Sequence, residues 1–189
     1  MPPLPDIKEW QRRIAIYDDE AAYRDLFRLF HKRLQRFSFT FLKSLEQSEE
    51  IVSDVFIKVW EKRRDLESID NLSVYLYVSV KNAALKQLLK EKKLASISID
   101  DLDVELESMH WNPEEILITA EMLQKIEGAI QELPPRCKII FKLIKEDRLR
   151  YKEVASILNI SVKTIDNQLA LALKKINKAI SFDLGKTLR

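Results

Sequence analysis

The side chains best suited to specific chemistry lie in residues 151–176, where amide, hydroxyl and amino groups recur at helical spacing. Amides can pair with adenine, an amino group with guanine, and a threonine with a hydroxyl contact or a thymine methyl group. A helix that presented such groups outward would read base edges in DNA. The residues expected on this face are Lys163, Thr164, Asn167, Gln168, Leu171 and Lys174.

Three residues in this segment are placed to build a helix-turn-helix. Ala155 is small enough for two helices to cross closely, Asn159 tolerates a left-handed turn, and Ser161 can cap the second helix. Lys174, Lys175 and Lys178 would then lie near phosphates. The alternative is an ordinary helical hairpin with a solvated polar face. The residues expected to face inward are Ile165, Leu169, Ala172, Leu173 and Ile176.

A second polar face is expected on a helix that starts at Asp70 or Asn71 and runs to about Leu94. Spacings of four, four and three place its members on one side, as a basic stripe on which a DNA strand could lie. Tyr75 and Tyr77 could stack on unpaired bases, although a tyrosine in a helical bundle is more often part of the core. The stripe consists of Asn82, Lys86, Lys90 and Lys93.

Acidic residues raise one competing hypothesis, an all-helical metal-dependent hydrolase. Glu49, Glu50 and Asp54 lie on adjacent helical turns and could hold Mg²⁺. We favour a structural explanation, because acids in the first turn of a helix interact well with its dipole, and Ser48 can cap such a helix. No second acidic pair at helical spacing completes a metal site in this segment.

Composition narrows the fold class to all-α. The chain has 189 residues, of which 46% are hydrophobic and 33% charged, and it contains only two glycines and six prolines. Residues 6–112 contain neither, which is typical of helices and excludes glycine-rich phosphate-binding loops there. The single cysteine, Cys137, cannot form an internal disulfide, and His31 and His110 are too far apart for a zinc cluster. We therefore expect no metal and no cofactor.

The same features predict a cytoplasmic protein. A lone cysteine fits a reducing compartment. The first residues show no basic segment followed by an apolar run, and no apolar stretch reaches the length of a membrane span. Neither secretion nor membrane insertion is expected.

Charge is distributed unevenly along the chain. The net charge is +2, but residues 1–95 carry 18 basic and 15 acidic side chains, residues 96–121 carry 0 and 8, and residues 122–189 carry 14 and 7. The segments therefore have net charges of +3, −8 and +7. This pattern predicts two modules that meet a polyanion, joined by a segment that a polyanion repels.

Apolar spacing predicts a bundle of three or four helices before residue 95 and four helices after residue 112. Apolar residues alternate in 96–112, but we expect an extended connector because no second strand is present for pairing. Asn112 and Pro113 should begin a helix that ends near Glu132. The last helix is expected from Ser161 to about Ile180.

These motifs resemble the extracytoplasmic-function (ECF) family of bacterial RNA polymerase sigma factors. The N-terminal segments SEEIVSDVFIKVWEKR and SVYLYVSVKNAALKQLLKEKK and the C-terminal segment LPPRCKIIFKLIKEDRLRYKEVASILNISVKTIDNQLALALKKI carry the resemblance. It implies a region 2-like domain over 1–95, an acidic linker over 96–112 and a region 4-like domain over 113–189. It also implies a non-enzymatic transcription initiation subunit, with core RNA polymerase and promoter DNA as partners and a membrane-bound anti-sigma factor as a further possible partner.

The resemblance also assigns roles to residues. A helix at 51–60 would grip core polymerase, with Phe56 and Val52 in the core and Trp60 either buried or in contact with the polymerase. The polymerase-binding residues would be Asp54, Val55, Lys58, Val59 and Trp60. The minus-ten residues would be Glu67, Ser68, Ile69, Asp70 and Asn71, in a loop around a flipped base, together with Asn82, Lys86, Lys90 and Lys93. The minus-thirty-five residues would be Arg136, Arg150, Lys152, Lys163, Thr164, Asn167, Gln168 and Lys174.

Two positions depart from the family pattern. Many relatives carry basic residues where Leu171 stands and near Asp166, so this recognition face is less positive than usual. Leu171 could instead be covered by a partner. The main alternative function is a helix-turn-helix repressor or activator, which would bind DNA without core polymerase.

Overall fold

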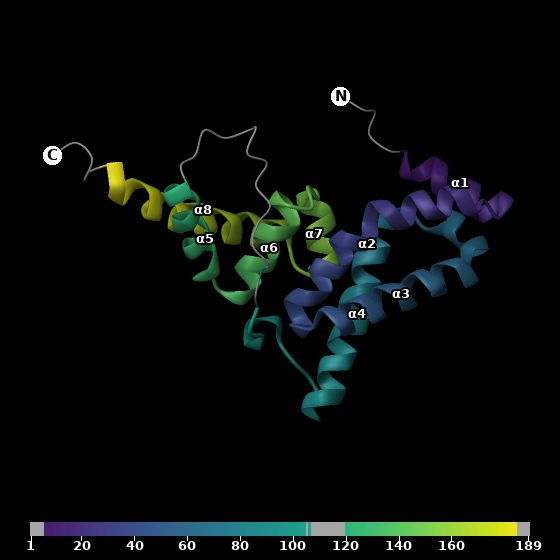
Figure 1. Ribbon diagram of the computed structural model, residues 1–189, viewed down its shortest axis with the longest axis horizontal. Coiled ribbons are helices and arrows are strands. Elements are labelled where there is room, and N and C mark those ends of the chain that lie inside the picture. The colour runs from purple at the N-terminus through teal and green to yellow at the C-terminus, as the bar shows by residue number, and fades with distance from the viewer. Residues whose placement is uncertain (1–5, 105, 107–119, 185–189) are drawn as a thin grey trace. The chain divides into compact units, whose positions relative to one another are not determined.

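The computed structural model describes residues 6–104, 106 and 120–184. The chain divides into two compact units, Met1–Ala95 and Ser96–Arg189. Every regular element in these ranges is an α-helix or a short 3-10 helix (Figure 1). This agrees with the all-α prediction.

The first unit contains α1 (Ile7–Tyr17), α2 (Glu20–Leu42), α3 (Leu45–Glu61), the 3-10 helix η1 (Arg63–Ser68) and α4 (Leu72–Lys92). Polar side chains cap the α-helices, because the first backbone N–H groups of a helix have no partner within it. Of the two predicted candidates, Asn71 is the cap of α4, and its side chain accepts a hydrogen bond of 3.0 Å from the Val74 N–H. The other three caps are Asp6, Asp19 and Ser44.

The prediction that Ser48 caps α3 is wrong. Ser44 takes that position, because its hydroxyl accepts a hydrogen bond from the Gln47 N–H, whereas Ser48 lies one turn inside the helix and is fully buried. Both serines precede acidic residues, so the sequence pattern alone fits either cap.

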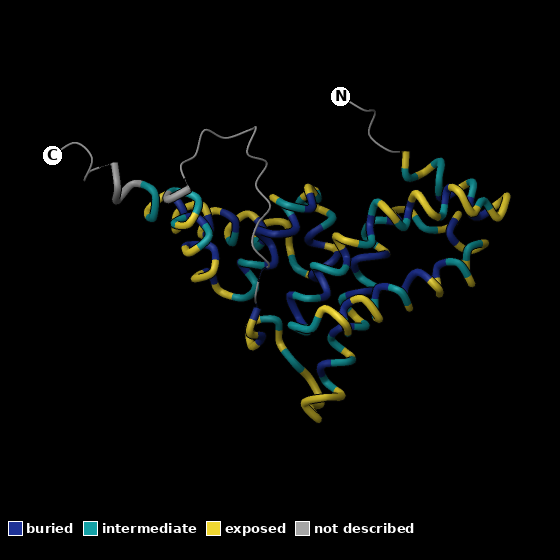
Figure 2. The backbone as a smooth tube through the Cα atoms, in the orientation of Figure 1, coloured by how far each residue is buried: buried dark blue, intermediate teal, exposed yellow. Residues whose placement is uncertain are grey.

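Aromatic rings form much of the core of this unit. Phe37 packs on Phe41 and on Tyr77, each with ring centroids 5.1 Å apart. Tyr77 is fully buried, which excludes it from stacking on DNA bases, whereas Tyr75 remains 36% exposed. Each helix turns one buried face inward and one exposed face outward, as the alternating blue and yellow along the tube in Figure 2 shows.

The second unit contains the 3-10 helix η2 (Ile99–Asp101), α5 (Ala120–Gln131), α6 (Pro135–Lys145), α7 (Tyr151–Leu158) and α8 (Val162–Leu184). The predicted helix start at Asn112 and Pro113 lies outside the described residues. On α6, Lys142 is 3% exposed, and its ammonium lies 2.9 Å from a Glu146 carboxylate oxygen and 3.8 Å from one of Asp147. A charged cluster is therefore buried in this unit.

Part of the predicted connector packs on α6. We call residues 98–104 and 106 the docked segment. Three of its apolar side chains, Leu102, Val104 and Leu106, are at most 6% exposed, and Ile99 is half-buried. The Lys138 ammonium donates a hydrogen bond of 3.0 Å to the Val104 carbonyl oxygen. The alternation of apolar residues thus arises from extended chain that covers a helix, without a partner strand.

Candidate nucleic-acid and polymerase interfaces

Helices α7 and α8 form the predicted helix-turn-helix. Asn159 ends α7 in the left-handed region, at φ 54° and ψ 50°, and the Ile160 N–H bonds to the Ala155 carbonyl oxygen at 3.0 Å. The Ser161 hydroxyl accepts a hydrogen bond of 3.0 Å from the Thr164 N–H and lies 2.8 Å from the Thr164 hydroxyl. The turn and the cap therefore fix where α8 begins.

The side chains predicted to face outward on α8 are all at least partly exposed. Lys163, Asn167 and Lys174 are exposed, and Thr164 and Gln168 are half-buried. Leu171 is also exposed, at 44%. Four of the five residues expected to face inward are buried, namely Ile165, Leu169, Ala172 and Ile176.

Leu173 is the exception on this helix. The sequence predicts an inward side chain, but Leu173 is 40% exposed. Its neighbour Ala172 is fully buried. Successive helical residues point about 100° apart, so the buried stripe follows Ala172 and leaves Leu173 outside it.

The docked segment restrains one predicted phosphate contact. An Arg136 guanidinium nitrogen lies 2.7 Å from a carboxylate oxygen of Asp100, and the arginine side chain is 30% exposed. Arg136 is therefore engaged by an acid of its own unit, which the sequence prediction missed. Arg150 and Lys152 are exposed, as a backbone contact requires.

The basic stripe predicted on α4 is exposed along its whole length. Lys93 lies one residue beyond the helix, as its C-cap in the left-handed region. On a neighbouring face, burial lowers the pKa of the Lys81 ammonium. The exposed members are Asn82, Lys86, Lys90 and Lys93.

The loop before α4 is anchored at both ends. Leu66 is 2% exposed and Leu72 is 2% exposed. Between these anchors Ile69 is half-buried. The remaining predicted minus-ten loop residues, all exposed, are Glu67, Ser68, Asp70 and Asn71.

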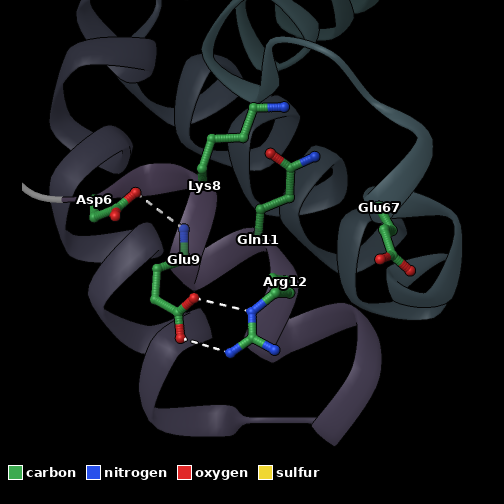
Figure 3. Close-up of a pocket in the computed structure, with 6 residues that line it drawn as sticks. All are labelled: Asp6, Lys8, Glu9, Gln11, Arg12 and Glu67. Atoms are coloured by element: carbon green, nitrogen blue, oxygen red, sulfur yellow. Dashed lines mark hydrogen bonds and ion pairs between the residues drawn. The ribbon is translucent and has the colours of Figure 1, made fainter.

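Beside this loop lies a hollow of about 320 Å³, lined by residues of α1 and by Glu67 (Figure 3). Gln11 reaches into the loop from α1, 55 residues earlier in the chain. The sequence offered no signal for this contact. The residues that line the hollow are Asp6, Lys8, Glu9, Gln11, Arg12 and Glu67.

The structure corrects the predicted polymerase-binding face of α3. Val55 and Val59 are 5% and 1% exposed, so they belong to the unit's own core. Asp54 and Lys58 are exposed, and between them Ile57 is 55% exposed. The sequence could have revealed Ile57, because it lies off the apolar stripe of this helix.

Trp60 is half-buried at the end of α3. Its ring lies 4.9 Å from the ring of Tyr23, and the Arg63 guanidinium lies 4.7 Å from the tryptophan centroid. The Tyr23 hydroxyl donates a hydrogen bond of 2.8 Å to the Phe56 carbonyl oxygen, and partial burial raises the pKa of that hydroxyl. Trp60 thus packs internally and keeps an accessible edge.

Comparisons with known proteins match both units. The model of Sigma-70 region 2 matches residues 26–94, and that of Sigma-70, region 4 matches residues 123–176. The ECF RNA polymerase sigma factor SigW of Bacillus subtilis is 20% identical over 86% of this chain and 90% of its own. The ECF RNA polymerase sigma factor RpoE of Cereibacter sphaeroides is 23% identical over 93% of this chain and 97% of its own.

Two solved structures show the same fold. CnrH, solved with the cytosolic domain of CnrY, gives a TM-score of 0.56 at 15% identity and covers 93% of this chain and 97% of its own. The sigma factor RpoE of Bartonella quintana, solved with the anti-sigma factor NepR, gives a TM-score of 0.57 at 22% identity. The match covers 85% of this chain and 98% of that one.

A helical unit of the region 2 type followed by one of the region 4 type defines a sigma-70 class subunit. Within that class, the chain belongs to the extracytoplasmic-function family of RNA polymerase sigma factors. It therefore serves RNA polymerase in promoter recognition and transcription initiation, and sigma factors are binding subunits rather than enzymes. Among the helices within the described ranges, none is long and apolar enough to cross a membrane.

Proposed function

We propose that this sigma factor divides its work between three exposed surfaces. The exposed face of α3 docks on core polymerase, the loop before α4 and the basic stripe engage the minus-ten element, and the start of α8 reads the minus-thirty-five element. The observation that carries this proposal is the match of regions 2 and 4, in that order, to one unit each.

The polymerase-docking surface consists of Asp54, Ile57 and Lys58, with the accessible edge of Trp60 beside it. Opposite charges one turn apart, with an apolar side chain between them, suit contact with another helix pair. Val55 and Val59 support this face from below.

At the minus-ten element, the loop from Glu67 to Asn71 encloses an unpaired base, and the stripe from Asn82 to Lys93 holds the displaced strand. Lysines at helical spacing follow a phosphate backbone, and unstacked bases expose edges that are hidden in a duplex. Melting and recognition can therefore occur in one step, without a catalytic residue.

At the minus-thirty-five element, α8 enters the major groove. Lys163 and Asn167 read base edges, Thr164 and Gln168 contribute from half-buried positions, and Lys174 lies near the backbone. Arg150 and Lys152 contact phosphates. Arg136 joins them only when Asp100 releases it, since the two now form an ion pair.

We further propose that the protein acts in the cytoplasm, where its polymerase partner works, and that an anti-sigma factor restrains it. Two proteins of the same fold were solved bound to CnrY and to the anti-sigma factor NepR, which supports a partner of this type.

Run-off transcription with purified core polymerase and the promoter upstream of the protein's own gene tests the proposal. Accurate initiation that requires the protein supports it. The competing hypothesis, a helix-turn-helix repressor or activator, predicts tight promoter binding without core polymerase. A gel-shift assay with and without core enzyme separates the two.

A further inference from the structure

Gln11 makes an unusual connection between α1 and the loop before α4. Its side chain is 3% exposed. The amide nitrogen donates one hydrogen bond of 2.5 Å to the Leu66 carbonyl oxygen and one of 2.7 Å to the Ile69 carbonyl oxygen. Both amide hydrogens are therefore used to hold backbone of the loop.

These two bonds fix the start of the loop. The Ile69 N–H also bonds to the Leu66 carbonyl oxygen at 3.0 Å, so Gln11 closes a turn already formed by the backbone. The Asn71 cap holds the other end. Between the two fixed ends, Glu67, Ser68 and Asp70 are presented to solvent.

Packing alone does not explain a glutamine at this position. The Gln11 amide oxygen is buried and has no hydrogen-bond partner among the described residues. An unpaired buried acceptor is unfavourable, and an apolar side chain of similar shape would avoid it. The two donated hydrogen bonds are what an apolar side chain could not supply.

We propose that Gln11 is a positioning residue for minus-ten recognition: its amide holds the Leu66 and Ile69 carbonyls so that the loop is preformed for the everted base. The inference rests on the proposed role of this loop. A preformed loop loses less conformational freedom when it closes on a base, so it favours the melted state. Figure 3 shows Gln11 pointing from α1 towards the loop that carries Glu67.

Two variants of similar shape remove the amide donors: Gln11→Met at every pH, and Gln11→Glu while its carboxyl is ionised. Each would be assembled with core polymerase on a promoter that carries 2-aminopurine at successive minus-ten positions. We expect about a tenfold loss of open complex, consistent with two lost hydrogen bonds. Base preference at the everted position should also fall, while core affinity and binding of minus-thirty-five duplex stay unchanged.

A pH series on Gln11→Glu gives a readout specific to hydrogen-bond donation. A protonated carboxyl can donate to one carbonyl, whereas a carboxylate only accepts. Burial beside the Leu66 and Ile69 carbonyl oxygens disfavours the charged form and therefore raises the pKa of a carboxyl at this position. Open-complex formation by Gln11→Glu should recover in part as the pH falls from 8 to 6, and Gln11→Met should show no such recovery. An identical pH profile for the two variants would overturn the role.

Ile14→Ala is the matched control, because Ile14 lies on the same helix, is fully buried and has no polar side-chain atom. It should lower the unfolding temperature at least as much as Gln11→Met and still keep base preference. The proposal would be overturned if Ile14→Ala lost base preference at the everted position, or if both Gln11 variants kept that base preference. A wild-type holoenzyme with no everted base would instead refute the loop's proposed function, and the role of Gln11 with it.

Discussion

The two units differ in the kind of polar side chain that they bury. Of the residues that the structure describes, the first unit buries only neutral polar side chains, namely Gln11, Ser38, Thr40 and Ser48, whereas the second buries Lys142 and Asp147. The same contrast holds beside the proposed DNA-binding parts. A neutral amide bonds to the loop proposed for minus-ten recognition, and the Asp100–Arg136 ion pair engages a proposed minus-thirty-five residue.

This difference has a physical consequence. Salt screens interactions between exposed charges but has little effect on a buried amide bonded to carbonyls. Orientation of the first unit's loop should therefore be insensitive to ionic strength. In the second unit, the fraction of Arg136 released from Asp100 should depend on ionic strength. The predictions below test this contrast, beginning with the largest effect.

The largest effect is expected from Lys163→Ala combined with Asn167→Ala on α8. Each lost base contact weakens binding by about 2 kcal/mol, so transcription from the cognate promoter should fall about a thousandfold. Run-off transcription measures the loss, and a pull-down with core polymerase should show unchanged binding. Weakened core binding would place these residues outside the DNA interface.

Removal of the buried charge in the second unit should cost stability. Lys142→Met removes the buried cation beside Glu146 and Asp147 and should lower the free energy of unfolding of that unit by about 3 kcal/mol. Urea denaturation followed by circular dichroism measures it. Lys145→Met, at an exposed position on the same helix, is the control and should change stability little.

The polymerase-docking surface provides the third test. Ile57→Asp should weaken core affinity about tenfold, because an apolar contact is lost and a charge is desolvated. The double charge reversal Asp54→Lys with Lys58→Glu should act in the same direction, and both should leave minus-thirty-five duplex binding intact. Unaltered core affinity, measured by fluorescence anisotropy, would remove α3 from the interface.

The smallest effect concerns the Asp100–Arg136 pair. Asp100→Asn should free Arg136 for phosphate and raise promoter affinity about threefold, since exposed ion pairs contribute up to about 1 kcal/mol. The slope of log affinity against log salt should steepen by up to about one. Arg136→Gln should cancel both changes in the double variant. An unchanged slope in Asp100→Asn would mean that Arg136 does not meet DNA.

Local patterns made the helices and several caps predictable. Asn71, Asn159 and Ser161 act through bonds to residues within four positions, so their roles can be read from the sequence. The outward face of α8 also followed from periodicity, with Leu173 as the error. Helical spacing fixes which residues share a face but leaves the edge of the buried stripe uncertain.

Contacts distant in sequence were not predictable. Nothing in the sequence marks Gln11 as a partner of Leu66, and nothing pairs Asp100 with Arg136. The docked segment was missed for a similar reason. Alternating apolar residues indicate extended chain, but the surface that covers them lies on α6, outside that pattern.

The docked segment also determines where a chimera of this protein can have its junction. A chimera that joins the first unit to a foreign region 4 is safest with its junction near residue 95, where the two units divide. A junction after residue 112 would separate the docked segment from α6, which bonds to the Val104 carbonyl oxygen, and from α5, which bonds to that of Leu106. The docked segment would then expose its apolar side chains, and such a chimera should aggregate even when each recognition helix is intact.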